Sequence, residues 1–298
     1  MKQRILGRDD MVFQLAVGLL SVFACVTVLY PLIFMVSASF SDPTSVIRGE
    51  VILWPVKPTL EGYRTILKYN GIWQGYRNTI LYTVFGTGIN VFCTVPAAYA
   101  LSRRDLRGRG FFTAFFAFTM FFNGGLIPTY LIVKRLGLVN TPYVLVILGA
   151  VSVWNMMIAR TYFQTTIPSE LQEAAYLDGC STTRLFLRIV LPLSTPILAV
   201  LVLFYAVGHW NNYFNAMIYL SDARWYPLQI YLRNILIMED MAELAGDEEA
   251  IQAWLQRLEL KESMKFGVVI VASVPVLALY PFLQKYFVKG MMVGAIKS

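Results

Sequence analysis

The chain has 298 residues, of which 57% are hydrophobic and 14% are charged. Ordinary soluble domains carry about 25% charged residues, so this composition excludes a typical soluble enzyme and indicates an integral membrane protein. The net charge of +7 is better explained by membrane topology than by a surface that binds nucleic acid.

Six windows of the sequence are long and apolar enough to cross a bilayer, which takes about 20 residues of helix. Asp, Glu, Lys and Arg occur only at their ends. The first apolar run is longer than a secretory signal core, so we expect it to remain as a span. The sequence thus predicts an all-α integral membrane fold, with one transmembrane domain over 1–298. The spans are expected at about 11–36, 79–101, 111–133, 143–160, 189–220 and 266–285.

The positive-inside rule orients these spans. Six spans place both termini on one side, together with the loop between the second and third spans and the loop 161–188. The former loop carries Arg103, Arg104, Arg107 and Arg109. The opposite side has two long loops, 37–78 and 221–265, whose charges steer topology only weakly. Both termini are therefore expected in the cytoplasm.

Several kinds of chemistry are disfavoured by what the chain lacks. It has one histidine, His209, and no carboxylate inside the expected spans, which speaks against a metal site, acid–base catalysis or a proton relay. No GxxxxGK[ST] phosphate cradle occurs, so any ATPase is expected on a separate chain. Two alternatives stay open, a secondary carrier driven by an ion gradient and a membrane scaffold that transports nothing.

The loop 161–188 contains the signals of a short helix. Ser169 and Gln172 have the spacing of a capping box, and acidic residues follow where the positive helix end favours them. Gly179 can take the left-handed conformation that ends a helix. A second helix is expected after it, capped by Ser181 or Thr182.

Helical spacing predicts one face of this first helix for a partner. The face is rich in alanine, and the polar side is acidic. Helices that rest on lipid usually bury Trp, Phe and Leu and are basic, so a protein partner fits better, although an interfacial helix is the alternative. The residues predicted to form the face are Leu171, Ala174, Ala175 and Asp178.

This loop resembles the signature of permeases from ATP-binding-cassette importers. That signature is Glu-Ala-Ala, three residues, Gly, nine residues and Ile-x-Leu-Pro, and every position matches. The matching residues are Glu173, Ala174, Ala175, Gly179, Ile189, Leu191 and Pro192. The resemblance implies a type I importer permease whose loop supplies the coupling helix for an ATPase, with Glu173 and its neighbours in that role and Asp178 as a supporting contact.

Other segments resemble the sugar-importing, maltose-type branch of that family. They are Arg77-Asn78-Thr79, Ile127-Pro128-Thr129-Tyr130, Leu136-Gly137-Leu138-Val139-Asn140-Thr141 and Trp210-Asn211. The resemblance implies sugar or oligosaccharide import across the bacterial cytoplasmic (inner) membrane. It also implies a second permease subunit, two ATPase subunits that use ATP and Mg²⁺, and an extracytoplasmic solute-binding protein, with no cofactor on this chain.

The expected fifth span has a dense group of amide and aromatic side chains that suits a sugar. Amides exchange hydrogen bonds with hydroxyls, and aromatic faces cover a sugar ring. The same asparagines could instead join helices together. The family often has proline where Ala216 stands, so a local helix break is in doubt. The pathway candidates here are His209, Trp210, Asn211, Asn212, Tyr213, Asn215 and Tyr219, with Asn212, Asn215 and Tyr219 expected on one face.

Three further pathway candidates lie in the expected third and fourth spans. They are Asn123, Trp154 and Asn155. Asn123 is followed by two glycines that could unwind the helix, although glycines in membrane helices more often allow close packing. In the outer loop, the acidic stretch 238–261 is expected to be helical and could contact the binding protein or simply face solvent.

Overall fold

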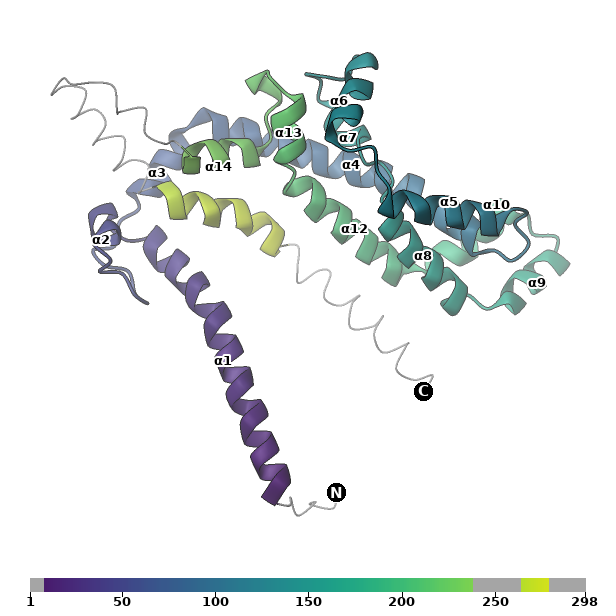
Figure 1. The fold of residues 1–298 in the computed structure, drawn as a ribbon, viewed down its shortest axis with the longest axis horizontal. Coiled ribbons are helices and arrows are strands. Elements are labelled where there is room, and N and C mark those ends of the chain that lie inside the picture. The colour runs from purple at the N-terminus through teal and green to yellow at the C-terminus, as the bar shows by residue number, and fades with distance from the viewer. Residues whose placement is uncertain (1–7, 238–263, 279–298) are drawn as a thin grey trace. The chain divides into compact units, whose positions relative to one another are not determined.

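The computed structural model of the chain describes residues 8–237 and 264–278. Within these ranges the chain forms helices joined by turns and loops, without a β-strand, which confirms the all-α class. The described residues divide into two compact units (Figure 1). One comprises 8–69, 232–237 and 264–273, and the other comprises 70–231 and 274–278.

The first unit begins with the long helix α1 (Arg8–Ser39). From Met11 onward it is apolar around its whole circumference, and none of its most apolar stretch is buried by the chain. A helix that is hydrophobic on all sides needs lipid or another protein around it, which supports the expected first span. The short helices α2 (Pro43–Ile47) and α3 (Glu61–Lys68) follow.

The second unit is built around α4 (Asn70–Ser102), which packs against α8 (Val153–Thr166) and α12 (Thr195–Trp210) (Figure 1). Apolar side chains from these helices share one core. Tyr205 adds a polar connection, because its hydroxyl lies 2.6 Å from Thr94 Oγ1 and accepts from the Ser152 amide at 3.2 Å. Buried hydroxyls are costly unless hydrogen-bonded, so this connection fixes the two helices and the segment before α8 together.

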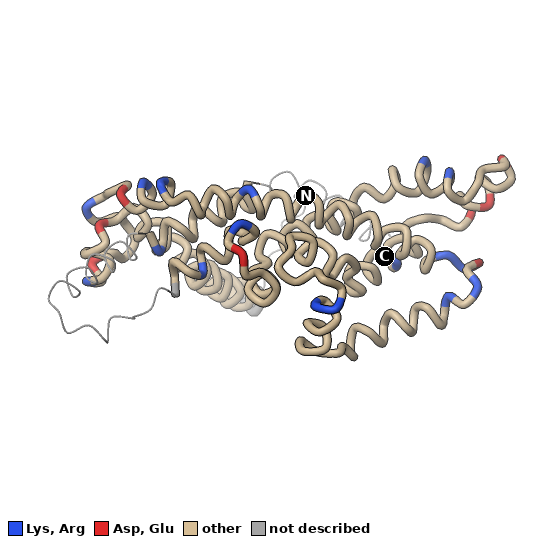
Figure 2. Tube along the Cα trace, turned by 90° about the horizontal axis from the view of Figure 1, so that it is seen from above, with Lys and Arg blue, Asp and Glu red and all other residues tan. Residues whose placement is uncertain are grey.

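Shorter elements complete the second unit. They are α5 (Arg109–Phe121), α6 (Leu126–Arg135), α7 (Tyr143–Ile147), α9 (Ser169–Leu177), α10 (Thr182–Leu185), the π-helical turn η1 (Phe186–Val190), α11 (Leu191–Leu193), α13 (Phe214–Tyr219) and the 3₁₀ turn η2 (Ala223–Trp225). The helix α14 (Leu228–Ile237) begins in this unit. Figure 2 shows Lys, Arg, Asp and Glu gathered at turns and helix ends, with long uncharged stretches of helix between them.

Two described helices, α1 and α4, are each long and apolar enough to cross a membrane, and the number rises to four if each of two bent pairs is one span. The expected spans 11–36 and 79–101 lie inside these two helices. The expected windows 111–133, 143–160 and 189–220 each contain a break in the helix, so none of them is one continuous helix. The last window begins in the apolar helix Met264–Ala278, and its remainder lies outside the described residues.

Candidate functional site

The helix α9 is the short helix expected in the loop 161–188. Its N-cap is Pro168, in an extended conformation (φ −63°, ψ 142°), and no side chain caps it. The predicted capping box of Ser169 and Gln172 is therefore wrong, because Ser169 already lies inside the helix, where its hydroxyl is not placed as a cap. Glu170 remains in the first turn, where the positive end of the helix dipole favours a carboxylate.

The end of α9 confirms the expectation for Gly179, whose φ is +71°. The Gly179 amide donates to the Tyr176 carbonyl at 3.0 Å, and the Cys180 amide donates to the Ala175 carbonyl at 2.9 Å. These two bonds form a Schellman motif, which needs a left-handed residue at the glycine position. Ser181 then caps α10 by accepting from the Arg184 amide at 3.4 Å, so the helix, turn, helix arrangement is confirmed.

The residues of α9 predicted to face a partner point to two different sides of the helix. Ala175 is 7% exposed and belongs to the core cluster that also contains Tyr99 and Phe163, with Leu171 packed against it. That part of the prediction is wrong, because the inner side of α9 is used to attach the helix to its own chain. The outward side carries Glu170, Glu173, Ala174, Leu177 and Asp178, all exposed. Their spacing places them on one face.

The segment after α9 contains a π-helical turn and one sharp bend, and both involve the rest of the signature. Pro192 lacks an amide proton and its ring crowds the carbonyl four residues earlier, and the π-helical turn η1 lies directly before α11 and widens the helix there. At Ser194 the chain bends by 81° into α12. Ile189 and Leu191 pack against the core cluster on the way.

The expected fifth span breaks in the middle of its polar group. The helix α12 ends at Trp210, and α13 begins at Phe214, so the break occurs although residue 216 is alanine. Asn212 lies outside both helices. The shared face predicted for Asn212, Asn215 and Tyr219 is therefore wrong, because helical spacing does not carry across a break.

His209 has a partner that sequence reasoning missed. Its Nε2 lies 2.6 Å from Asn90 Oδ1, and Asn90 Nδ2 donates to the carbonyls of Gly149 at 3.0 Å and Ala150 at 2.8 Å. Gly86 makes room for the ring, because a Cβ there would overlap the imidazole. The available signal was a glycine and an asparagine four residues apart in an apolar span, which places them on one helix face.

The remaining candidates of the fifth span divide into buried and exposed side chains. Trp210 is 6% exposed, with its ring 6.2 Å from that of Tyr76, and Tyr219 is 1% exposed and stacked on Tyr130. Asn211 and Tyr213 are exposed. Asn215 is half-buried, as is His209. The exposed pair lies at the surface of the chain, whereas the buried pair packs inside it.

The glycines after Asn123 unwind the chain. Phe122 and Gly125 cap the two helices on either side, and α5 and α6 meet at 111°. Gly125 has φ +81° and would have no atom within 4 Å of an added Cβ, so the prediction of close packing is wrong and the alternative of local unwinding is confirmed. Asn123 is exposed and accepts from the Gly125 amide at 3.0 Å.

Trp154 and Asn155 lie in the first turn of α8 and face different surroundings. Trp154 is 64% exposed, whereas Asn155 is 7% exposed. Asn90 connects this region to the fifth span, because it bonds both His209 and the segment just before α8. Asn90 of α4 thus joins one candidate of the fifth span, His209, to the backbone just before α8.

Residues 70–293 match the family described as "Binding-protein-dependent transport system inner membrane component". The chain belongs to this family. It is therefore a membrane component of a transport system, which confirms the resemblance drawn from the Glu-Ala-Ala signature.

Named members of this permease family are similar over nearly the whole chain. The polygalacturonan/rhamnogalacturonan transport system permease protein YtcP of Bacillus subtilis (strain 168) is 39% identical over 94% of this chain and 96% of its own. Protein LplC of the same strain is 37% identical over 90% of this chain and 89% of its own. A solved bacterial ABC transporter "involved in the import of the acidic polysaccharide alginate" has a chain with 34% identity and a TM-score of 0.85, covering 96% of this chain and all of that one.

Two of the segments that resemble sugar permeases hold the loop after α13. Asn78 Nδ2 donates to the carbonyls of Arg224 and Tyr226 at 2.8 and 3.0 Å, and Thr79 Oγ1 accepts from the Leu228 amide at 2.8 Å. Both side chains belong to α4 and are buried. Their role in this permease is to satisfy backbone groups that would otherwise be buried without a partner.

Asn140 holds the other end of the same loop. It has φ +60°, its amide donates to the Tyr219 carbonyl at 2.7 Å, and its Oδ1 accepts from the amides of Ser221 and Asp222 at 3.0 and 2.9 Å. Asparagine is among the few residues that adopt the left-handed region readily. Asn140, near the end of the segment Leu136–Thr141, thus supplies both the left-handed conformation and the hydrogen bonds that hold the loop.

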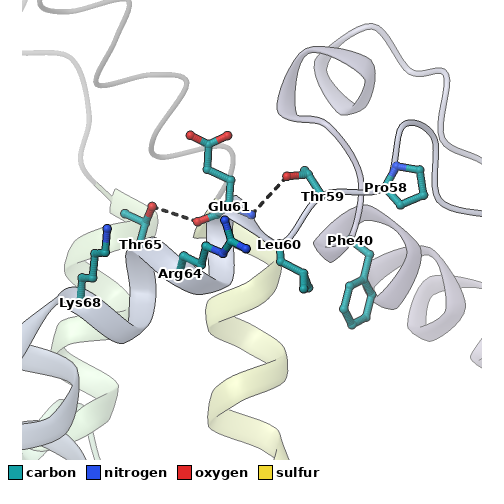
Figure 3. A pocket seen from close by; sticks show the side chains of 8 residues that line it. All are labelled: Phe40, Pro58, Thr59, Leu60, Glu61, Arg64, Thr65 and Lys68. Atoms are coloured by element: carbon teal, nitrogen blue, oxygen red, sulfur yellow. Dashed lines mark hydrogen bonds between the residues drawn. The ribbon is translucent and has the colours of Figure 1, made fainter.

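The first unit of the permease has a surface pocket beside α3 (Figure 3). Glu61 donates its amide to Thr59 Oγ1 and accepts from Thr65 Oγ1, which fixes the start of the helix. None of the pathway candidates lines this pocket. Its lining residues are Phe40, Pro58, Thr59, Leu60, Glu61, Arg64, Thr65 and Lys68.

Proposed function

We propose that this permease is the membrane-spanning subunit of an ATP-binding-cassette importer that carries an oligosaccharide across the bacterial cytoplasmic membrane. The chain itself performs no chemistry. Two ATPase subunits use ATP and Mg²⁺, a second permease subunit completes the pathway, and an extracytoplasmic binding protein delivers the solute. Family membership and the likeness to the alginate importer chain support this assignment.

The proposal includes six spans with both termini in the cytoplasm. Support comes from α1 and α4, from the two bent pairs, and from the apolar helix Met264–Ala278. The arginines between α4 and α5 agree with a cytoplasmic position for that turn. Broken helices inside a membrane are tolerated where other protein or water satisfies the freed backbone groups.

The observation that carries the proposal is the outward face of α9. It presents two glutamates, Ala174, Leu177 and Asp178 to a partner, while Ala175 on the other side anchors the helix. Closure of the ATPase pair on ATP would move α9. Because α9 is joined to α8 and α10 by short segments, its motion would shift the expected fourth and fifth spans and switch access to the pathway.

The substrate class that we propose is an acidic oligosaccharide. The solved relative imports an acidic polysaccharide, and polygalacturonan, named for the relative with 39% identity, is a polymer of galacturonic acid. Amides and aromatic rings bind neutral sugars equally well. The proposal that the solute is anionic therefore rests on these relatives and not on the polar group of the fifth span.

For the pathway, we propose that the exposed candidates contact the solute and the buried ones support them. Asn123, Trp154, Asn211 and Tyr213 are exposed on this chain, so they are free to line a path that the second permease closes. A solute hydroxyl can replace water at such amides without leaving a group unpaired.

Reconstitution of the whole importer tests the function. Proteoliposomes contain the two permeases, the ATPases and the binding protein, and uptake and ATP hydrolysis are measured together. Glu173→Lys should abolish most uptake, and Gly179→Val should do the same because valine resists the left-handed conformation by roughly 1–2 kcal/mol. Membrane insertion should be unchanged. Thr165→Lys is the control for introducing a lysine, since Thr165 lies on the exposed surface of α8.

The outcomes separate the alternatives. Normal uptake in both variants would remove α9 from the coupling role. Uptake that follows an ion gradient without the ATPases would identify a secondary carrier, and ATP hydrolysis unaffected by any loaded binding protein would indicate a scaffold. Stimulation of ATP hydrolysis by the loaded binding protein is compared across uronate-containing and neutral oligosaccharides to identify the substrate class. Stimulation by neutral sugars alone would overturn the acidic assignment.

A further inference from the structure

The turn between α4 and α5 carries an arginine that is nearly buried although its neighbours are exposed. The Arg103 side chain is 10% exposed, whereas Arg104 and Arg107 are exposed. An arginine is seldom buried unless its charge is paired. The groups that contact the Arg103 side chain therefore indicate its role.

Arg103 is held in a defined position by its own turn. Its Nε and Nη2 donate to the two carboxylate oxygens of Asp105 at 2.8 and 2.5 Å, and its Nη1 donates to the Tyr99 hydroxyl at 3.2 Å. A two-pronged pair of this kind fixes orientation as well as distance. The hydrogen bonds from Arg103 hold the pKa of Asp105 below its ordinary value, so the pair stays charged at neutral pH.

The free face of this oriented guanidinium meets α9. Its central carbon lies 5.5 Å from the centre of the Tyr176 ring, within the range in which a cation is attracted to an aromatic face. The Tyr176 hydroxyl lies 3.2 Å from Thr182 Oγ1, so the same ring also contacts the start of α10. Arg103 thus joins α9 to a helix that is distant in sequence.

The other end of the connection is firmly packed. Tyr99, in the last turns of α4, is 5% exposed, stacks on Phe186 with ring centres 4.9 Å apart, and meets Phe163 edge to face at 5.7 Å. Interiors packed in this way transmit displacement instead of absorbing it. A movement of Tyr176 would therefore be passed through Arg103 to α4.

We propose that Arg103 is a positioning residue that joins α9 to the end of α4, so that α9 moves the expected second span together with the fourth and fifth. This inference rests on the proposed function, in which α9 receives the motion of the ATPases. Asp105 orients the guanidinium, and Tyr176 is the surface against which it acts.

The test measures uptake per ATP hydrolysed in the reconstituted importer. Arg103→Ala and Tyr176→Leu remove the contact and should lower this ratio about fivefold, the effect of roughly 1 kcal/mol from one cation–aromatic contact, while ATP hydrolysis continues. Tyr176→Phe keeps the ring and should retain the ratio. Arg103→Lys keeps a cation and should recover part of it. Arg104→Ala, an exposed neighbour, should behave as wild type.

Two results would overturn the inference. One is a wild-type ratio in both Arg103→Ala and Tyr176→Leu, and the other is a loss in Tyr176→Phe as large as in Tyr176→Leu, which would assign the effect to the Tyr176 hydroxyl instead of its ring. A general loss of structure would lower ATP stimulation and uptake together and leave the ratio unchanged, and it would count against the proposal. Failure of the proposed function is distinguished by wild-type vesicles that show no ATP-driven uptake.

Discussion

His209 donates a hydrogen bond to Asn90 from its Nε2, across 2.6 Å to Oδ1. The direction follows from the other contacts of the asparagine, because its amide nitrogen already donates to the carbonyls of Gly149 and Ala150. A neutral His209 therefore carries its proton on Nε2. The single histidine of the chain thus joins α12 to α4, and Asn90 extends the connection to the turn before α8.

We expect Asn90→Leu to lower the free energy of unfolding by about 2–3 kcal/mol, since it removes three hydrogen bonds and leaves the carbonyls of Gly149 and Ala150 without their side-chain donor. His209→Phe should cost about 1 kcal/mol, because it removes one bond. The double variant should lose less than the two losses added together, since both variants remove the same bond. Thermal unfolding of the purified complex measures this, and strictly additive losses would contradict the shared bond.

Gly86→Ala should destabilise the protein by about 1–3 kcal/mol, because overfilling a packed position forces its neighbours to move. The added methyl group would overlap the His209 ring. The matched control is Gly88→Ala, in the same helix, where a Cβ meets nothing within 4 Å. Since alanine favours helix over glycine by roughly 0.5–1 kcal/mol, the control should be neutral or slightly stabilising. Equal effects of the two substitutions would show that the ring is not close to Gly86.

Two substitutions of Asn140 separate conformation from hydrogen bonding. Asn140→Gly tolerates φ +60° and loses only the two bonds to Ser221 and Asp222. Asn140→Ala loses the same bonds and also carries left-handed strain of roughly 1 kcal/mol. The alanine variant should therefore melt at a lower temperature than the glycine variant. Identical melting temperatures would show that the backbone relaxes at this position.

The contact between Arg103 and Asp105 predicts a pH dependence. The pKa of Asp105 is lowered from 3.8, chiefly by its hydrogen bonds from Arg103. A lowered pKa contributes stability that is complete above the unfolded value and is lost as the pH falls through the folded value. Asp105→Asn should thus be less stable than wild type by the same margin at pH values of about 7 and about 5. The margin should narrow below pH 3.8, and a margin that grows on acidification would contradict this assignment.

The sequence predicted the features that depend on short stretches of chain. Hydropathy located α1 and α4, and the need for a left-handed residue located the end of α9 at Gly179. The break after Trp210 was left in doubt for want of a proline at position 216, and it occurs nevertheless. A hydropathy window averages over the polar residues at such a break and therefore sees one continuous span.

Pairs that are distant in the sequence were beyond this reasoning. His209 and Asn90 are separated by 119 positions, and Arg103 reaches a ring in another helix. Helical spacing identified which residues of α9 share a side, yet it could not tell that Ala175 joins the core cluster that contains Tyr99 and Phe163. Only the tertiary packing decides which side of an alanine-rich helix remains outward.

Leu177 stands at the end of the outward face of α9 with 90% of its surface exposed. Burying a leucine side chain completely stabilises a protein by roughly 1.5–3 kcal/mol. A chain without its partners does not gain this stabilisation at Leu177. The unassembled subunit is therefore more prone to non-specific association than the assembled one. Synthesis of the permease in excess of its partners should carry a cost in aggregation that the completed importer does not share.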